Sequence, residues 1–413
     1  MKARRVFAFA ASSMGASIAA SIAIAHAEMP LPMAKAPEEV GLSSTQLKRI
    51  EAVTKDHIEQ GLAPGAVMLV ARRGKIAWMS VQGFRDRDAK APMQADSIFR
   101  IYSMTKPIVS IAVMQMVEEG KFQINDPVSA LLPEIGQMKV GVDGKEPAHA
   151  MTIQDLLRHT SGLIYGTRGN DAVHKAYVEA KLPNRDITLA EFVTQLSKLP
   201  LAFSPGERWE YGVSVDVLGR LLEVASGGKP LHDILAERVL KPLGMTDTAF
   251  WVPPAKLART AQPWHSPLRS DRMTPRFDVA QQPKFESGGG GLTSTMSDYV
   301  RFTAALANGG VLGGKRIIGK QTLAFMTSDH VGSRPGRPPG LGFGLGFEVR
   351  TRVGDSGLPG SVGEYGWAGN AGTLFWIDPK EQLVAIYMVQ VDDNDRVYLR
   401  NQFRTMVQAA IVD

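Results

Sequence analysis

The sequence predicts an α+β protein in which one antiparallel sheet has the terminal helices on one face and a mostly helical region on the other. Strand-like runs occur only in the first and last thirds of the chain. A helical pattern precedes the first of these runs and another follows the last. The middle third has helical patterns separated by long loops. Because antiparallel strands from both ends can pair, we expect them to form one sheet.

The first third predicts a helix followed by a hairpin. Ser43 and Ser44 can cap a helix that ends near Gly61. Two runs rich in apolar residues follow at 65–71 and 75–81, and an Arg-Arg-Gly turn joins them. We therefore expect a β-hairpin directly before the apolar segment that begins at residue 108.

The middle region, about residues 123–295, is expected to be helical. A glycine run at 288–291 lacks the Lys-Ser/Thr pair of a phosphate-binding loop, so it predicts a turn before a helix near 296–307. Helices are also expected after capping boxes at 152–155 and 188–191, and at about 215–225 and 230–240.

The strand pattern returns after residue 342. Strands are expected at 344–350, 372–378 and 383–391, and a last helix at 397–412. The sheet-containing part of the protein is therefore predicted to cover about residues 38–122 and 296–413.

The first 27 residues have the features of an export signal. Three basic residues precede an alanine-rich apolar stretch that ends in Ala25-His26-Ala27. An Arg-Arg pair near the start leaves both the general and the twin-arginine export routes open. We predict a signal peptide at 1–27 and one domain at 28–413. We also predict no stable membrane anchor after signal removal, and a periplasmic or secreted location.

Charge and composition exclude several function classes. Removal of the signal lowers the net charge from +6 to +3, because that segment contains three basic residues and no acidic ones. The balance argues against nucleic acid as a partner. The absence of cysteine excludes disulfides, a thiolate nucleophile and thiolate metal sites. The eight histidines include no i, i+4 pair, so we predict no metal and no cofactor.

The segment Ser-Met-Thr-Lys at 103–106 opens an apolar helix. Apolar residues at positions 108, 111, 112 and 116 form one stripe, which predicts a half-buried helix that ends at Gly120. Ser103 then lies at the helix N-terminus, where free N–H groups favour developing negative charge. Lys106 lies about one turn further, and a lysine in a dry site can act as a base toward the serine. A second Ser-x-x-Lys, at 226–229, crosses a Gly-Gly pair that ends its helix, so its lysine is not held over its serine.

Such a nucleophile also needs a group that moves its proton and a site for the oxyanion. Tyr211 lies between a Pro-Gly turn and a helix, and a phenol beside an ammonium ionises more easily. Near the end of the chain, the small residues of 365–372 let a backbone N–H approach a substrate. The pattern alone leaves two alternatives: an ordinary packed tyrosine, and a simple glycine-rich turn between strands.

These segments resemble, in order and spacing, those of the serine β-lactamase/penicillin-binding superfamily. The resemblance covers nearly the whole chain after the signal and is closest to the class C β-lactamase-like branch, in particular the family VIII carboxylesterases. It implies the two-part β-lactamase-like fold expected above. The matching motifs are Ser-x-x-Lys at 103–106, Tyr-Gly-Val at 211–213 and Trp-Ala-Gly at 367–369, with further matches at 159–163, 204–211 and 242–247.

The resemblance implies a role for each motif residue. Ser103 would be the nucleophile, and Lys106 and Tyr211 the proton-transfer pair, with either as the main base. The backbone N–H groups of Ser103 and Asn370 would form the oxyanion hole. Substrate binding is assigned to Tyr102, Val213, Trp367, Ala368 and Gly369.

Two departures from the class C pattern bear on the substrate. Val213 stands where those β-lactamases carry asparagine, and Trp367 stands where they carry a lysine that binds the β-lactam carboxylate. An indole offers apolar area and one N–H donor instead. We therefore expect a serine hydrolase of carboxylesterase type that cleaves small or short-chain esters. The alternatives are a β-lactamase, a D-amino-acid peptidase, a small-amide hydrolase or a non-catalytic penicillin-binding-like protein, and the oligomeric state stays open.

Overall fold

The computed structural model describes residues 29–267, 277–392 and 394–413. The predicted signal peptide lies outside the described residues. Among the described residues, no helix is both long enough and apolar enough to cross a membrane.

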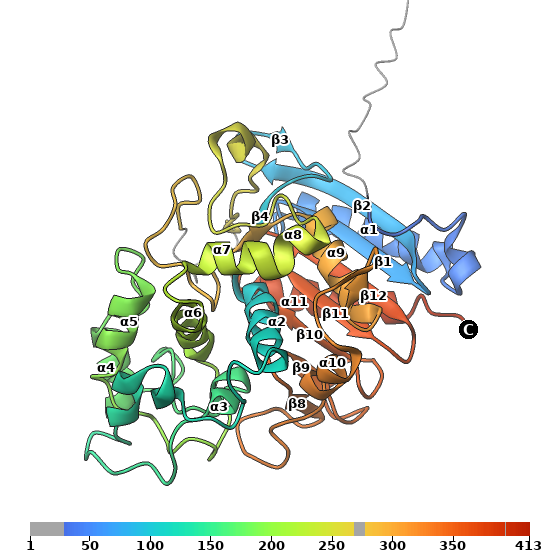
Figure 1. The fold of residues 1–413 in the computed structure, drawn as a ribbon. Helices are drawn as coiled ribbons and strands as arrows, with labels where there is room; N and C mark the ends of the chain where they lie inside the picture. Colours follow the sequence, from blue (N-terminus) through green and yellow to red (C-terminus); the bar gives the residue numbers. More distant parts are fainter. Residues whose placement is uncertain (1–28, 268–276, 393) are drawn as a thin grey trace, which may run out of the picture.

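One antiparallel sheet of eight strands forms the centre of the molecule (Figure 1). Strand β1 pairs on one side with β2, its hairpin partner, and on the other with β12, where Val67 lies opposite Met388. The first and last thirds of the chain therefore share one sheet, as predicted. The order across the sheet is β3 (Ala91–Pro92), β2 (Lys75–Asp86), β1 (Gly65–Arg72), β12 (Leu383–Val389), β11 (Leu374–Asp378), β10 (Tyr365–Ala368), β9 (Glu348–Arg350) and β8 (Leu341–Phe343).

The two faces of the sheet bury different sets of side chains, because successive residues of a strand point to opposite faces. On one face, Met68 of β1 packs in a core with Leu399 and Phe403 of α11 (Asp395–Gln408), and α1 (Ser44–Glu59) contributes to the same core. On the other face, Val67 packs in a larger core shared with α2 (Thr105–Glu118), α6 (Ser214–Ala225) and α9 (Met296–Ala307). This arrangement confirms the predicted fold class (Figure 1).

The middle of the chain forms short helices, as expected. Both predicted capping boxes are present, at Thr152 and Asp155 and at Thr188 and Glu191. The helices are α3 (Ile153–Leu157), α4 (Ala172–Glu179), α5 (Leu189–Leu196), α6 (Ser214–Ala225), α7 (Leu231–Leu235), a π-helical turn (Ala236–Leu240) and α8 (Lys241–Leu243), followed by α9 (Met296–Ala307) and α10 (Lys320–Met326). Two small sheets pair β4 (Phe99–Arg100) with β5 (Thr293–Ser294) and β6 (Val311–Leu312) with β7 (Lys315–Arg316).

Helix α2 (Thr105–Glu118) departs from the half-buried helix that was predicted. All of its residues from Thr105 to Met114 are buried, and so is Met116. The helix lies between the sheet and α6, and apolar residues such as Val109 and Val113 face partners outside the predicted stripe. A helix that is apolar all round is typically buried on every side, and this one is the central helix of the molecule.

The predicted strand at 344–350 was also wrong in part. Two short strands, β8 and β9, replace it, and they are separated by a bend at Gly344–Gly346. In that bend Leu345 donates its N–H to Met326 of α10, and Gly346 has a φ of 95°. The backbone turns away from the sheet there because it docks against α10 and α2.

Candidate active site

Ser103 lies in a 3-10 turn, Tyr102–Met104, that connects β4 to the first turn of α2. The residue before it, Tyr102, has a φ of 43°, which is costly for a side chain other than glycine and occurs mostly where the surroundings impose it. The hydroxyls of Ser103 and Tyr211 share a hydrogen bond of 2.6 Å. The structure therefore brings together two predicted residues that are 108 positions apart in the chain.

Lys106 is completely buried beneath Ser103. Its Nζ lies 3.4 Å from the Ser103 Oγ, 3.2 Å from the Tyr165 hydroxyl and 2.6 Å from the carbonyl oxygen of Gly289. Three oxygen atoms around one nitrogen match the three donors of an ammonium group. The lysine is thus held by a backbone carbonyl and a second phenol, neither of which the motif predicted.

A buried carboxylate stands behind this lysine. Asp216 of α6 accepts hydrogen bonds from the Gly289 N–H at 3.0 Å and from the Ser287 hydroxyl at 2.5 Å. Burial raises the pKa of Asp216, and the positive charge of Lys106 opposes that rise. The predicted turn at 288–291 is present, and it links the carboxylate to the lysine through the two ends of Gly289.

Tyr211 precedes α6 and is packed among aromatic rings. Trp209 stacks on it with a centroid separation of 6.1 Å, and the indole N–H of Trp367 donates to its hydroxyl at 3.4 Å. Two cations lie over its ring, with Lys106 Nζ at 4.5 Å and the Arg168 guanidinium at 5.0 Å from the centroid. The aromatic ring of Tyr211 is thus held between other rings and two cationic side chains.

His159 borders the same ring at a centroid distance of 4.9 Å. It is fully buried, and neither ring nitrogen has a hydrogen-bond partner among the described residues. Burial holds the pKa of His159 well below its usual range, and the charge of Lys106 lowers it further. The imidazole is therefore a neutral packing partner for Tyr211 at neutral pH.

The end of β10 forms the wall opposite Tyr211. Trp367 and Ala368 close this strand, and the following turn presses Gly369 against the backbone that leads to Ser103. A Cβ at Gly369 would lie 2.4 Å from the carbonyl oxygen of Ile101, so only glycine fits. The glycine-rich segment is thus a turn between strands that packs against the backbone just before Ser103.

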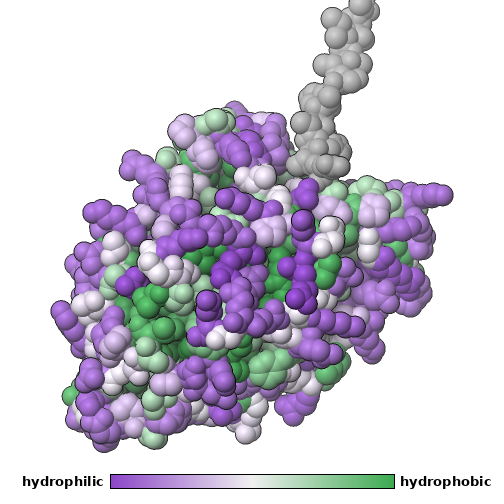
Figure 2. All heavy atoms as spheres, in the orientation of Figure 1, coloured by the Kyte–Doolittle hydropathy of each residue, from purple (hydrophilic) through white to green (hydrophobic). Residues whose placement is uncertain are grey.

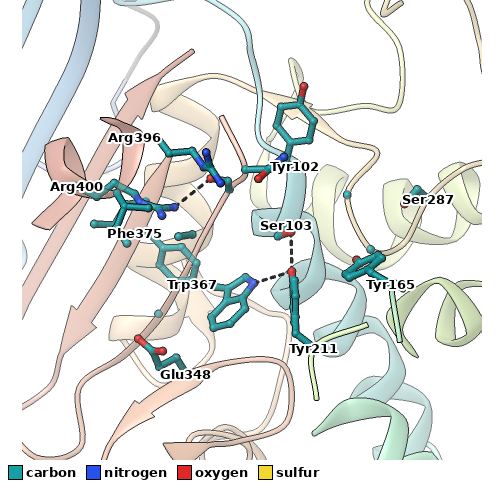
Figure 3. Close-up of a pocket in the computed structure, with 18 of the residues that line it drawn as sticks. Tyr102, Ser103, Tyr165, Tyr211, Ser287, Glu348, Trp367, Phe375, Arg396 and Arg400 are labelled. Carbon is teal, nitrogen blue, oxygen red and sulfur yellow. Dashed lines mark hydrogen bonds between the residues drawn. The ribbon is translucent and has the colours of Figure 1, made fainter. Parts of the chain in front are cut away.

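These elements enclose a cavity of about 1070 Å³, and apolar surface gathers in a central depression on the face shown in Figure 2. Figure 3 shows Ser103, Tyr211 and Trp367 directed toward one another at this cavity. Within the described residues, no group of three or more His, Cys, Asp or Glu side chains could hold a metal ion. The predicted site residues that line the cavity are Tyr102, Ser103, Tyr211, Trp367, Ala368, Gly369 and Asn370.

Val213 is not among the lining residues, which corrects its assignment to substrate binding. Its side chain is almost completely buried, and it packs into the large core on the α2 side of the sheet. The backbone turns into α6 directly after Val213, so the side chain of this third motif position points inward. The substitution of valine for asparagine therefore removes a polar group without adding an apolar wall.

Sequence reasoning missed three residues that the structure places at the centre of the site: Tyr165, Asp216 and Gly289. Each contacts Lys106, or contacts its partner, from a distant segment of the chain. The one available signal was the position of Asp216, five residues after Tyr211 and between two valines at the start of its helix. A backbone carbonyl such as that of Gly289 leaves no mark in a sequence.

Several known proteins are similar to this chain over most of its length. The family model described as Beta-lactamase matches residues 50–408. Protein Rv1367c of Mycobacterium tuberculosis is 36% identical over 365 residues, which cover 82% of this chain and 89% of that protein. Esterase EstB of Burkholderia gladioli is 34% identical over 354 residues, which cover 80% and 86%. The solved structure of EstCE1, described as a hydrolase with promiscuous acyltransferase activity, is 26% identical with a TM-score of 0.77, and the match covers 89% of this chain and 99% of that one.

Proposed function

We propose that this protein is an exported carboxylesterase that acts through an acyl-enzyme on Ser103. The proposal starts from the family: the chain belongs to the β-lactamase family of serine hydrolases. The observation that carries the proposal is the position of the Ser103 Oγ, which lies 2.6 Å from the Tyr211 hydroxyl and 3.4 Å from Lys106 Nζ at the wall of a cavity. A serine hydroxyl beside a phenol and a lysine, which together can relay its proton, is an arrangement suited to nucleophilic catalysis.

The reaction follows from these contacts. Ser103 Oγ attacks the ester carbonyl carbon while its proton passes to the Tyr211–Lys106 pair. The negative oxygen that forms lies between the backbone N–H groups of Ser103 and Asn370. When the carbon–oxygen bond breaks, Tyr211 returns the proton to the departing alcohol. Water then attacks the acyl-enzyme and loses its proton to the same pair. The bond between the acyl carbon and Ser103 Oγ breaks, the serine oxygen takes that proton back, and the carboxylic acid is released.

The chemistry of the cavity next to Ser103 favours a neutral acyl group. Trp367 and Tyr165 present aromatic surface beside the nucleophile, where a β-lactamase of class C would present a lysine. EstB, named as an esterase, is one of the relatives that share most of the chain. We therefore propose small or short-chain esters as substrates, and we place β-lactams, D-amino-acid peptides and small amides second.

The test compares turnover of p-nitrophenyl butyrate and of nitrocefin by the purified protein and by Ser103→Ala. We expect the ester to react faster, and the variant to lose on the order of 10³-fold or more of kcat, because nucleophile and bases act as a unit. Faster nitrocefin turnover would reverse the order of substrates. Absence of a fluorophosphonate adduct on Ser103 by mass spectrometry would favour a non-catalytic binding protein instead.

Export is part of the proposal and rests on the sequence of residues 1–27. Fractionation of cells that produce the full chain tests it. The protein is expected outside the cytoplasm with its N-terminus near residue 28, and an uncleaved chain retained in the cytoplasm would contradict it.

A further inference from the structure

We propose that Arg400 is a positioning residue for the oxyanion site, because it binds the carbonyl oxygen of Gly369 and so orients the N–H of Asn370. The inference rests on the proposed function. It adds a residue from the opposite face of the sheet, on α11, which no sequence motif indicated.

The contact is a single hydrogen bond between a helix and a turn. Nη1 of Arg400 donates to the Gly369 carbonyl oxygen at 3.1 Å, and Figure 3 shows this side chain reaching toward the cavity beside Arg396. The same oxygen also accepts the N–H of Gly372 at 3.1 Å across the turn. The oxygen side of this peptide is therefore held by two donors.

Peptide geometry converts this contact into an orientation for the next residue. In a trans peptide the C=O of one residue and the N–H of the next point in opposite directions within one plane. Holding the Gly369 oxygen on the Arg400 side therefore directs the Asn370 N–H to the other side. Gly369 itself presses on the carbonyl of Ile101, two residues before Ser103, and Asn370 lines the cavity with Ser103.

The charge of the guanidinium adds to the effect of its position. A cation bound to a carbonyl oxygen polarises the amide and makes its N–H a stronger donor. Burial lowers the pKa of Arg400 to about 10, with neighbouring Arg396 adding to the shift. The side chain is thus still charged at the pH of an ester assay, even though it is largely withdrawn from water.

A neighbouring arginine shows what a purely structural contact looks like on this helix. Arg404, one turn further along α11, pairs with the buried carboxylate of Glu364, which also binds Arg350 of β9. That network joins the helix to the sheet through opposite charges. Arg400 instead places its charge on a backbone carbonyl next to the nucleophile.

The experiment compares Arg400→Met, Arg400→Gln and Arg400→Lys. Thr405→Ala, at an exposed position of α11 that does not line the cavity, is the control for disturbance of the helix. Each variant is assayed for kcat and KM on p-nitrophenyl butyrate, and for the Ki of a trifluoromethyl ketone, which forms a tetrahedral oxyanion on serine. The melting temperature of each variant reports whether it folds. If Arg400→Met does not fold, the comparison of Arg400→Gln with Arg400→Lys still tests the inference.

We expect kcat of Arg400→Met to be roughly 10- to 100-fold lower than that of the wild type, with KM within about threefold of the wild-type value. This decrease in kcat is smaller than the decrease seen when an oxyanion-hole donor is removed outright. The affinity for the ketone should fall by a similar factor. Arg400→Lys should recover part of both losses, because an ammonium can donate to the same carbonyl. The values for Arg400→Gln should lie between those of Arg400→Met and Arg400→Lys.

Four results would overturn the inference: wild-type kinetics of Arg400→Met, a rise in KM alone, a fall in kcat with unchanged ketone affinity, or an equal loss in Thr405→Ala. The outcome also separates this inference from the proposed function. If Ser103→Ala is inactive while Arg400→Met behaves as wild type, only the positioning role fails. If Ser103→Ala keeps its ester turnover, the proposed function fails first.

Discussion

Replacing Gly369 by alanine tests whether the close approach of the β10 turn to the nucleophile is needed for catalysis. The added Cβ would lie 2.1 Å from Thr373 Oγ1 and 2.4 Å from the carbonyl oxygen of Ile101. The threonine hydroxyl can rotate away, but the Ile101 carbonyl is backbone that leads directly to Ser103. The turn must therefore move away from Ser103 to accept the methyl group.

The magnitude follows from the size of this overlap. Carbon and oxygen atoms in contact lie at about 3.4 Å, so the turn must move by about 1 Å. A displacement of about 1 Å between catalytic groups costs on the order of 100-fold in rate, which is about 2.7 kcal/mol in the activation free energy. Overpacking of this kind also lowers the free energy of unfolding by about 1–3 kcal/mol.

The assay measures kcat for p-nitrophenyl butyrate, normalised to the fraction of enzyme that reacts with a fluorophosphonate, together with urea unfolding. The double variant Gly369→Ala with Thr373→Ala is the matched control, because it removes the side-chain overlap and leaves the overlap with Ile101. We expect the double variant to remain as slow as the single one. A kcat within twofold of wild type in Gly369→Ala, or full recovery in the double variant, would refute the reasoning.

Three further predictions concern the polar residues Tyr165 and Asp216 at the site and Asp298 on α9. Tyr165→Phe removes one of the three oxygen partners of Lys106 and should lower kcat by about 10-fold with little change in KM; steady-state kinetics with an unchanged kcat would show that the contact is incidental. Asp216→Asn should lower kcat by on the order of 10-fold or more. The same variant should have a higher melting temperature at pH 8, because burial raises the pKa of Asp216 and its charged form destabilises the folded state. A lower melting temperature than that of the wild type would contradict this. Burial also raises the pKa of Asp298 from 3.8 to about 6. As the pH rises from 3.8 through 6, the free energy of unfolding of the wild type should therefore fall by about 2–3 kcal/mol relative to that of Asp298→Asn. Urea titrations across this pH range measure both values, and a difference that does not change with pH would contradict the prediction.

Much of the fold could be predicted because its signals are local. Short apolar runs bounded by turn residues mark the hairpin at 65–81 and the last strands, and hydroxyl caps mark the starts of α1, α3 and α5. Because the sequence shows no strand pattern in the middle third, the strands of the first third can be predicted to pair with those of the last third. Helix α2 was harder, because a stripe of apolar residues predicts one buried face and the tertiary structure buries the others as well.

The candidate site divides in the same way. The meeting of Ser103, Lys106 and Tyr211 could be predicted because all three lie in motifs whose order and spacing resemble those of a known superfamily. The environment of Lys106 could not, because its shortest contact is with the backbone carbonyl of Gly289. The inward direction of Val213 depends on where α6 begins, and a shift of one residue at a helix start rotates a side chain by about 100°.

The pairing of β1 with β12 has a consequence for how activity first arises during synthesis. Residues 66–72 lie against residues 383–389, so the middle of the sheet cannot form until nearly the entire polypeptide has been made. The position of the turn that carries Asn370, close to the backbone before Ser103, depends on this part of the sheet, which forms late. A polypeptide cut short before its last strand would contain Ser103 without the sheet that brings the Asn370 turn beside it, and we expect it to be inactive. Pairing of segments so far apart in the chain is slow.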